Sequence, residues 1–339
     1  MQAPPLRGAF IGFGGVAAKG HLPGWRARSD TAIVAAADVA SQRRQAFLAA
    51  SPGARVYESV DELLAGETLD FVDICTPPGS HAGLIARALD AGLHVLCEKP
   101  LTTRLEDARR VAAAAARAER VVHTVHNWLE APVCLRVSAL ISEGAIGAVR
   151  SLRWRTLRSA PAAASDAAGN WRVDPARAGG GILFDHGWHA LYCIMRWAGG
   201  TPRALSASLE TRRFREWPLE DTATLALDLA TATGHVHLTW AADERANHIE
   251  LEGERGSIAV VGDSVVVEGP SGRSRWSCPP SLSEGSHHPE WFAGVAEDFH
   301  AAIAGDAADN LDEALLCARL IDLAQRSSAA GGARLPLEA

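Results

Sequence analysis

The sequence predicts an α/β protein with two domains: a doubly wound parallel sheet over residues 1–126, and an α+β domain with an open, mainly antiparallel sheet over residues 127–339. The chain has 339 residues, enough for about two domains of roughly 150 residues each. Up to residue 126, short apolar runs alternate with helical patterns, which is typical of βαβ units. Beyond it, several segments alternate apolar and polar residues with period two, which is typical of antiparallel strands with one buried face.

Five uniformly apolar runs in the first part predict parallel strands that are buried on both faces. They cover residues 8–11, 31–37, 71–75, 94–97 and 121–125. Helical spacing predicts helices between these strands, at residues 16–27, 41–50, 81–91 and 105–118.

The second part begins with a predicted helix over residues 132–143, which Gly144 and Gly147 end. Period-two alternation then predicts strands at residues 149–158, 204–209, 222–229, 235–240, 248–252 and 265–268. Helical spacing predicts further helices at residues 179–197, 290–304 and 311–328. A sheet covered on one face leaves a second, apolar face to bury, so we expect a homodimer or homotetramer through this sheet.

Composition excludes several classes of protein. The formal net charge is −7 without a basic stripe, so we expect no binding to nucleic acid or to anionic membranes. No apolar run approaches 18 residues, so no membrane span is expected. The six cysteines form no CxxC pair, and buried thiols in a reducing compartment are the simplest interpretation. With no secretory signal pattern at the N-terminus, we expect a cytoplasmic protein.

A glycine-rich turn follows the first predicted strand and opens a helix. It consists of Gly12, Phe13, Gly14, Gly15, Val16 and Ala17, which fits the GxGxxA form of the dinucleotide fingerprint of Rossmann domains. Gly12 permits the tight turn, Gly14 lets a pyrophosphate approach, and the helix N-terminus offers free N–H groups. Asp38 ends the second strand, where a carboxylate accepts hydrogen bonds from the adenosine ribose. The sequence therefore predicts an NAD site, with NADP left open.

Two proline-containing segments leave the carboxyl ends of later strands, where ligands of such sheets bind. One contains Thr76, Pro77, Pro78 and His81, and the other Glu98, Lys99 and Pro100. Lys99 is one of two lysines in a chain that otherwise uses arginine, and only lysine can release its proton near neutral pH. We expect these residues beside the nicotinamide, with Lys99 in the chemistry.

A third segment, residues 179–189, opens with three glycines and contains Asp185 and His189. At helical i, i+4 spacing the two side chains share one face, and a carboxylate beside an imidazole suits general acid–base chemistry. Taken alone, the pair could merely stabilise the helix.

Together these motifs resemble the Gfo/Idh/MocA family of NAD(P)-dependent oxidoreductases, which includes glucose–fructose oxidoreductase and inositol dehydrogenases. The resemblance implies that Lys99, Asp185 and His189 form the catalytic group. It implies that Lys99 or His189 takes an alcohol proton while hydride moves to C4 of NAD⁺. It also implies that the last helix packs back on the first domain.

Three residues near these motifs are weaker candidates for contact with the substrate: Trp128, Trp188 and His186. The two indoles could stack on the apolar face of a sugar or cyclitol, or they could be ordinary packing. Asp185, His186 and His189 could suggest a metal, but adjacent helical residues do not aim at one ion, so no metal is expected.

The expected function is hydride transfer between NAD(P) and a carbinol of a sugar, cyclitol or related polyol, a small-molecule substrate. Two alternatives stay open. One is a redox-neutral glycosidase or epimerase with tightly bound NAD. The other is a non-catalytic NAD-binding regulatory protein.

Overall fold

The computed structural model describes residues 4–163 and 169–338, and it divides into two compact units. The N-terminal unit comprises the residues up to Asn127 and the segment His287–Leu315. The C-terminal unit comprises Trp128–Ser286 and the residues from Leu316 onward. One unit holds a parallel sheet and the other a mainly antiparallel sheet, so the predicted fold class is confirmed.

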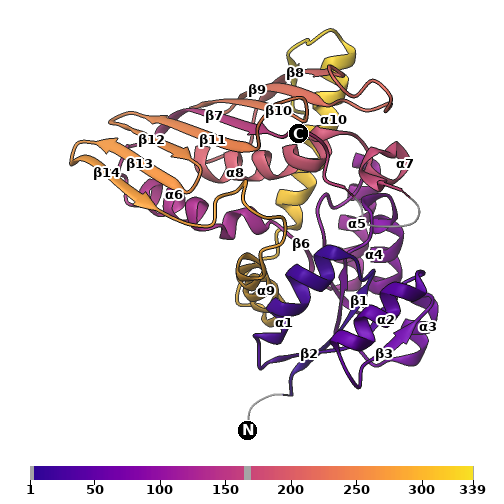
Figure 1. Ribbon diagram of the computed structural model, residues 1–339. Helices are drawn as coiled ribbons and strands as arrows, with labels where there is room; N and C mark the ends of the chain where they lie inside the picture. The colour runs from indigo at the N-terminus through magenta and orange to yellow at the C-terminus, as the bar shows by residue number, and fades with distance from the viewer. Residues whose placement is uncertain (1–3, 164–168, 339) are drawn as a thin grey trace. The chain divides into compact units, whose positions relative to one another are not determined.

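The N-terminal sheet has six parallel strands in the order β3-β2-β1-β4-β5-β6 (Figure 1). The strands are β1 (Leu6–Ile11), β2 (Thr31–Ala37), β3 (Arg55–Tyr57), β4 (Phe71–Ile74), β5 (His94–Cys97) and β6 (Val122–Thr124). The prediction missed β3, because three residues at a sheet edge make no apolar run. The strand order reverses between β1 and β4, and ligands of such sheets bind at the carboxyl ends of the strands there.

Most helices of this unit lie within the predicted ranges, but α3 was not predicted. The helices are α1 (Leu22–Arg26), α2 (Ser41–Ala50), α3 (Val60–Gly66), α4 (His81–Asp90), α5 (Leu105–Ala118) and α9 (Pro289–Ala304). Figure 1 shows α9 beside α1, and Phe292 and Phe299 of α9 join Trp25 and Phe71 in the hydrophobic core. The resemblance implied that the last helix packs on the first domain. The helix from the C-terminal part of the chain that joins this core is α9. The last helix, α10 (Leu311–Ala329), begins in this unit and continues in the other.

The helix predicted over residues 16–27 is two short pieces. A π-helix spans Ala17–His21, in which the N–H of Leu22 donates to the carbonyl of Ala17, and α1 follows. Pro23 has no N–H to donate to the carbonyl four residues earlier, so a regular α-helix cannot run through this position. The π-turn places His21 toward the interior, where it is 2% exposed.

The C-terminal sheet has nine strands in the order β14-β13-β12-β11-β7-β10-β9-β8-β15. The strands are β7 (Val149–Leu157), β8 (Ala204–Glu210), β9 (Thr222–Asp228), β10 (Thr233–Thr239), β11 (Ala246–Gly253), β12 (Ser257–Val261), β13 (Ser264–Gly269), β14 (Gly272–Ser277) and β15 (Leu335–Pro336). The β7–β10 pair is parallel and the other pairs are antiparallel. Helices α6 (Pro132–Ser142) and α8 (Trp188–Ala198) lie along one face of this sheet (Figure 1).

The helix predicted over residues 179–197 begins later than expected. A short α7 (Pro175–Ala178) ends at Gly179, which has φ 87°. A π-helix then spans Leu183–Gly187 and leads into α8. Gly181 lies so close to the segment before β9 that an added Cβ would be 1.8 Å from the carbonyl oxygen of Glu220. Gly181 therefore permits a close approach of two backbone segments. The predicted i, i+4 relation of Asp185 and His189 requires a regular α-helix, whereas a π-helix covers Asp185 here.

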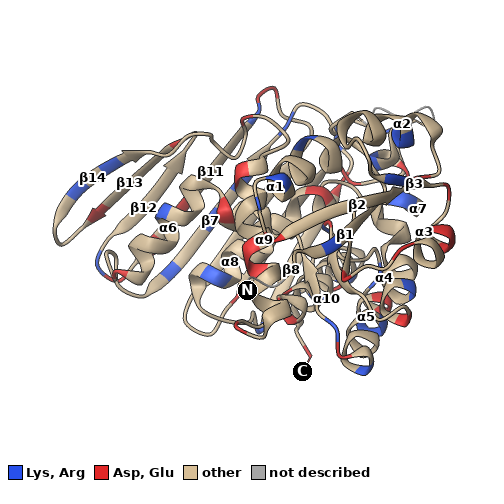
Figure 2. Ribbon diagram, turned by 90° about the horizontal axis from the view of Figure 1, so that it is seen from below, with Lys and Arg blue, Asp and Glu red and all other residues tan. Residues whose placement is uncertain are grey.

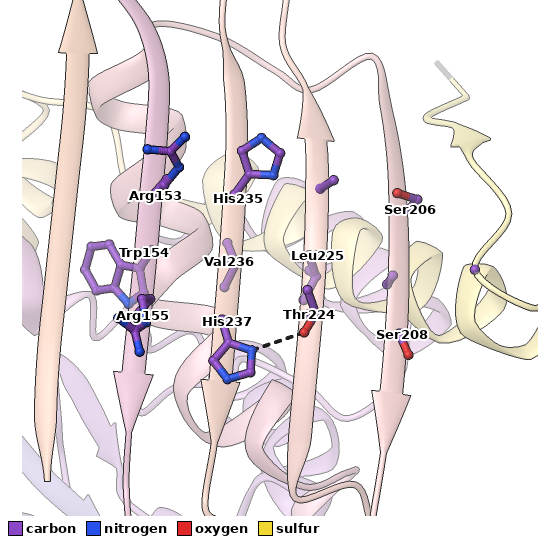
Figure 3. Close-up of a pocket in the computed structure, with 13 residues that line it drawn as sticks. Arg153, Trp154, Arg155, Ser206, Ser208, Thr224, Leu225, His235, Val236 and His237 are labelled. Carbon is purple, nitrogen blue, oxygen red and sulfur yellow. Dashed lines mark hydrogen bonds between the residues drawn. The ribbon is translucent and has the colours of Figure 1, made fainter. Parts of the chain in front are cut away.

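The outer face of the C-terminal sheet is polar, so the expectation of an apolar face is wrong. Figure 3 shows Arg153 and Arg155 of β7 beside His235 and His237 of β10, with Thr224 of β9 bonded to His237 at 3.1 Å. The alternating apolar residues, such as Trp154 and Val236, are buried on the opposite, helix-covered face.

Acidic and basic residues are interspersed along α5 (Figure 2). Arg110 of this helix pairs with Glu106 and Asp107. Among the helices within the described residues, none has the length and apolar character that a bilayer span requires.

Candidate active site

The glycine-rich turn and the Thr76 segment meet at the carboxyl ends of β1 and β4. Gly12 has φ 85°, and an added Cβ would lie 2.7 Å from Cγ2 of Thr76. A Cβ at Gly14 would lie 2.7 Å from Nη1 of Arg43, so this guanidinium lies over the turn. Gly12 is thus favoured by its left-handed backbone and by the close approach of Thr76, as the fingerprint predicts, whereas the atom nearest to Gly14 is the end of a flexible side chain.

Asp38 lies against the same turn. Its Oδ2 accepts a hydrogen bond from the N–H of Phe13 at 2.8 Å, and its Oδ1 accepts from the N–H of Ala40 at 2.8 Å. Arg44 is directed away, since it donates to the carbonyl of Asp38 and pairs with Glu58. The carboxylate therefore has a fixed place at the edge of the predicted nucleotide site.

His81 ties the two proline-containing segments together. It is buried, with Nε2 2.8 Å from the carbonyl oxygen of Thr76 and Nδ1 3.0 Å from that of Pro100. Burial lowers its pKa, and the hydrogen bonds to the two carbonyl oxygens oppose this only in part. This geometry gives His81 a supporting place behind both loops.

Glu98 and Lys99 follow β5. The Lys99–Pro100 peptide bond is cis. Glu98 turns inward: its Oε2 accepts from the backbone N–H of Lys99 at 2.9 Å, and its Oε1 lies 3.1 Å from Nε2 of His21. Burial would raise the pKa of the Glu98 carboxyl, but the hydrogen bond and charge of His21 outweigh it and lower that pKa.

In the C-terminal unit, Asp185 lies in the π-helix before α8. Its Oδ2 is 3.2 Å from Nδ1 of His186, and its Oδ1 is 3.9 Å from Nε of Arg172. Arg172 packs over the ring of Trp171. The sequence analysis did not identify Arg172 as a neighbour of Asp185, since thirteen residues and a loop separate them.

His189 is buried and held from two sides. Its Nδ1 lies 2.6 Å from the hydroxyl of Tyr192, and its ring stacks on Trp128 with centroids 4.2 Å apart. The N–H of Trp128 donates to the same hydroxyl at 3.1 Å. Burial raises the pKa of Tyr192, so the phenol keeps its proton. Trp128 therefore orients His189, and Tyr192 is a residue that the sequence analysis missed.

Trp188 is fully buried beside His189 in the chain. A fully buried indole is typical of packing, so Trp188 fits the packing alternative and not contact with a substrate. The depression of about 410 Å³ in Figure 3 lies elsewhere, on the outer face of the C-terminal sheet, and Asp185, His186 and His189 do not line it.

Comparison with known proteins defines the class of this chain. Residues 6–126 match an oxidoreductase family with an NAD-binding Rossmann fold, and residues 134–259 match the GFO/IDH/MocA C-terminal domain. The chain belongs to the Gfo/Idh/MocA family of oxidoreductases, as the motifs predicted.

Several relatives share part of the chain. D-apiose dehydrogenase of Paraburkholderia graminis is 37% identical over 142 residues, which cover 42% of this chain and 38% of that protein. An uncharacterized oxidoreductase of Synechocystis is 27% identical over 78% of this chain and 74% of its own length. D-glucoside 3-dehydrogenase of Escherichia coli is 30% identical over 58% of this chain and 54% of its own length. Alignments to the named dehydrogenases thus span about half of their length or less.

Solved structures share the whole fold. An oxidoreductase from Agrobacterium radiobacter, solved with NAD⁺, L-tartaric acid and magnesium, superposes with a TM-score of 0.87 over 98% of each chain at 23% identity. Levoglucosan dehydrogenase with NADH gives a TM-score of 0.85 at 22% identity, over 98% of this chain and 99% of that chain.

Proposed function

We propose that this protein is an NAD-dependent dehydrogenase that oxidises a carbinol of a sugar, cyclitol or related polyol. The observation that carries the proposal is the meeting of the glycine-rich turn, Thr76 and the Glu98-Lys99-Pro100 segment at the carboxyl ends of β1, β4 and β5. This is the strand reversal at which dinucleotides bind. NAD⁺, when bound, accepts a hydride from the carbinol carbon. The family and the named sugar dehydrogenases among its relatives support the substrate class.

The cofactor would lie along the turn and the two proline-containing segments. Backbone N–H groups of residues 14–16 would face the pyrophosphate, and Asp38, which already accepts from the N–H of Phe13, would accept from the adenosine ribose. Thr76, Pro77 and Pro78 would shape the wall beside the nicotinamide, with His81 and Glu98 supporting it from behind.

In this proposal Lys99 takes the alcohol proton as hydride leaves the carbon, and Asp185 and His189 bind the substrate. The phenol of Tyr192 already accepts from the N–H of Trp128. If its own hydrogen goes to Nδ1 of His189, the neutral imidazole carries its proton on Nε2 and donates to the substrate. His189 is then a hydrogen-bond donor, and Lys99 is the base.

The test is a panel of sugars, inositols and dihydrodiols with purified protein and NAD⁺, followed by NADH absorbance. Turnover of at least one member supports the proposal. Consumption of substrate without NADH would assign the redox-neutral alternative. Tight NAD binding with no conversion of any member would assign the regulatory alternative.

We further propose a cytoplasmic homodimer or homotetramer that uses the outer face of the C-terminal sheet. That face carries both signs of charge, with Arg153 3.7 Å from Glu250 and Arg273 3.3 Å from Glu268. A second copy could match basic against acidic strands. A monomer by light scattering at micromolar concentration would contradict this.

A further inference from the structure

His21 is a buried histidine that the nucleotide fingerprint does not use. It ends the π-helix that follows the glycine-rich turn and is 2% exposed. Its ring stacks on Phe292 of α9, with centroids 4.0 Å apart. A histidine in such surroundings needs polar partners for both ring nitrogens.

Those partners are two carboxylates from different strands. Nδ1 lies 2.9 Å from Oδ2 of Asp73 on β4, and Nε2 lies 3.1 Å from Oε1 of Glu98 after β5. Trp25 also donates to Oδ2 of Asp73, at 2.8 Å, which holds that carboxylate in place. Carboxylates accept hydrogen bonds, so both ring nitrogens donate here, which requires the imidazolium form.

The electrostatics agree with this geometry. Burial lowers the pKa of His21, but the charges and hydrogen bonds of its neighbours, those of Asp73 foremost, together outweigh burial and hold that pKa well above its ordinary value. The third neighbour is Cys75, with Sγ 3.3 Å from Nδ1. Burial raises the pKa of this thiol, so it remains protonated.

The same atoms could suggest a metal site. His21, Asp73 and Cys75 each place a ligand atom within 4.8 Å of the others, and they form the one such group among the residues that the structure describes. A metal needs a lone pair on the imidazole and a thiolate. In the geometry described here both ring nitrogens of His21 face carboxylate oxygens as donors, so Nδ1 is committed to Asp73 in this state of the group.

We propose that His21 is a positioning residue for Lys99, an inference that rests on the proposed function. Its imidazolium joins Asp73 to Glu98, and Oε2 of Glu98 accepts the backbone N–H of Lys99 at 2.9 Å. His21 therefore fixes the start of the Lys99 segment relative to β4 and to the helix after the glycine-rich turn. A small displacement of a reacting group costs a large factor in rate.

The first test compares His21→Gln with His94→Gln. His94 lies on β5 itself, accepts from the N–H of Val121, and has a pKa that burial lowers, so it is a matched neutral control. We expect His21→Gln to reduce kcat roughly ten- to a hundredfold, with KM and the Kd for NAD within about threefold. We expect His94→Gln to keep kcat. Unchanged kcat in His21→Gln would overturn the proposal, as would an equal loss in both variants.

The second test needs no substrate, so it separates this proposal from the proposed function. The chain has two lysines, so ¹³Cε-lysine NMR gives two side-chain signals, which Lys19→Arg assigns. His21→Gln should shift the Lys99 signal and leave Lys19 in place, and His94→Gln should shift neither. ¹⁵N imidazole shifts of the wild type should show His21 doubly protonated at pH 7.5. A neutral ring, or an unmoved Lys99 signal, would overturn the proposal even if the enzyme turns over.

If His21→Gln does not fold, Glu98→Gln tests the same link with the imidazole left in place. It removes the charge that His21 pairs with, and we expect the same shift of the Lys99 signal and a similar loss of kcat. Both quantities unchanged would overturn the proposal. A wild type with no turnover would refute the proposed function, while the NMR result still decides the role of His21.

Discussion

At the scale of single residues, the nucleotide site contains two opposing determinants. The carboxylate of Asp38 is fixed by the N–H groups of Phe13 and Ala40, where it would repel a 2′-phosphate. The guanidinium of Arg43 lies over Gly14, where it would attract one. Arg44, one residue further along α2, pairs with Glu58 instead and does not lie over Gly14.

We predict that the wild type binds NAD more tightly than NADP, because Asp38 is anchored by two backbone hydrogen bonds. Arg43→Ala should weaken NADP binding by roughly three- to tenfold and leave NAD binding nearly unchanged. Arg44→Ala is the control and should change neither. Calorimetry measures both affinities, and equal or tighter binding of NADP by the wild type would contradict the prediction.

His189 supplies a second residue-scale prediction. If it donates to the substrate while Lys99 takes the proton, His189→Ala should lower kcat/KM roughly a hundredfold but keep the rise of kcat/KM with pH. Loss of that rise in His189→Ala would assign the base to His189 instead. The matched variant Tyr192→Phe keeps the ring and removes the hydroxyl, and it should lower activity less, because it removes the partner of Nδ1 and not the imidazole.

At the scale of secondary-structure elements, Gly181 and Gly83 differ in the space that an added Cβ atom would find. Gly181 approaches the backbone of Glu220, and Glu220 in turn accepts from the N–H groups of Gly181 and Leu183 at 2.9 and 3.1 Å. Gly83 is exposed inside α4, with no atom within 4 Å of an added Cβ.

Gly181→Ala should therefore destabilise the protein by at least about 2 kcal/mol, since backbone must move to make room. Gly83→Ala should stabilise it by about 0.5–1 kcal/mol, because alanine loses less entropy in a helix. Urea unfolding of both variants measures this. A Gly181→Ala variant as stable as the wild type would show that Gly181 and Glu220 do not approach each other as closely as described.

Strand β6 contains a buried histidine, His123, whose protonation is unfavourable in the folded state. Burial, reinforced by the charge of His126, lowers the pKa of His123 from 6.5 to about 3. Its Nδ1 is buried without a hydrogen-bond partner within the described residues. The unfolded chain therefore binds a proton in this range that the folded chain does not.

Because the unfolded chain binds this proton and the folded chain does not, the free energy of unfolding decreases as pH falls from 6.5 toward about 3. The decrease is up to about 1.4 kcal/mol per pH unit. His123→Gln should flatten this fall, while His235→Gln, at an exposed position on the outer sheet face, should not. Denaturant melts at pH 7 and pH 5 check it. An equal loss in His123→Gln and the wild type would contradict the prediction.

At the scale of the whole molecule, the sequence predicted both sheets, because burial on one or two faces leaves a direct periodicity in the chain. It did not predict β3, β12, β14 or β15: β3 and β15 have three and two residues, and the outward residues of β14 are charged. Both π-helices escaped detection because their spacing resembles an α-helix over so few residues. The motifs predicted Asp38, Lys99 and His189 as candidates, but the contacts of His21 and Tyr192 with this candidate site depend on tertiary structure that no local pattern encodes.

The central claim is that Lys99 handles the proton in an NAD-dependent dehydrogenase. The most direct measurement is the turnover of Lys99→Arg beside Lys19→Arg, which changes the other, exposed lysine. Arginine keeps the positive charge but cannot release a proton near neutral pH. With the best substrate of the panel, Lys99→Arg should retain NAD affinity and lose turnover roughly a hundredfold or more, while Lys19→Arg keeps both. A Lys99→Arg enzyme with most of the wild-type turnover would contradict the account.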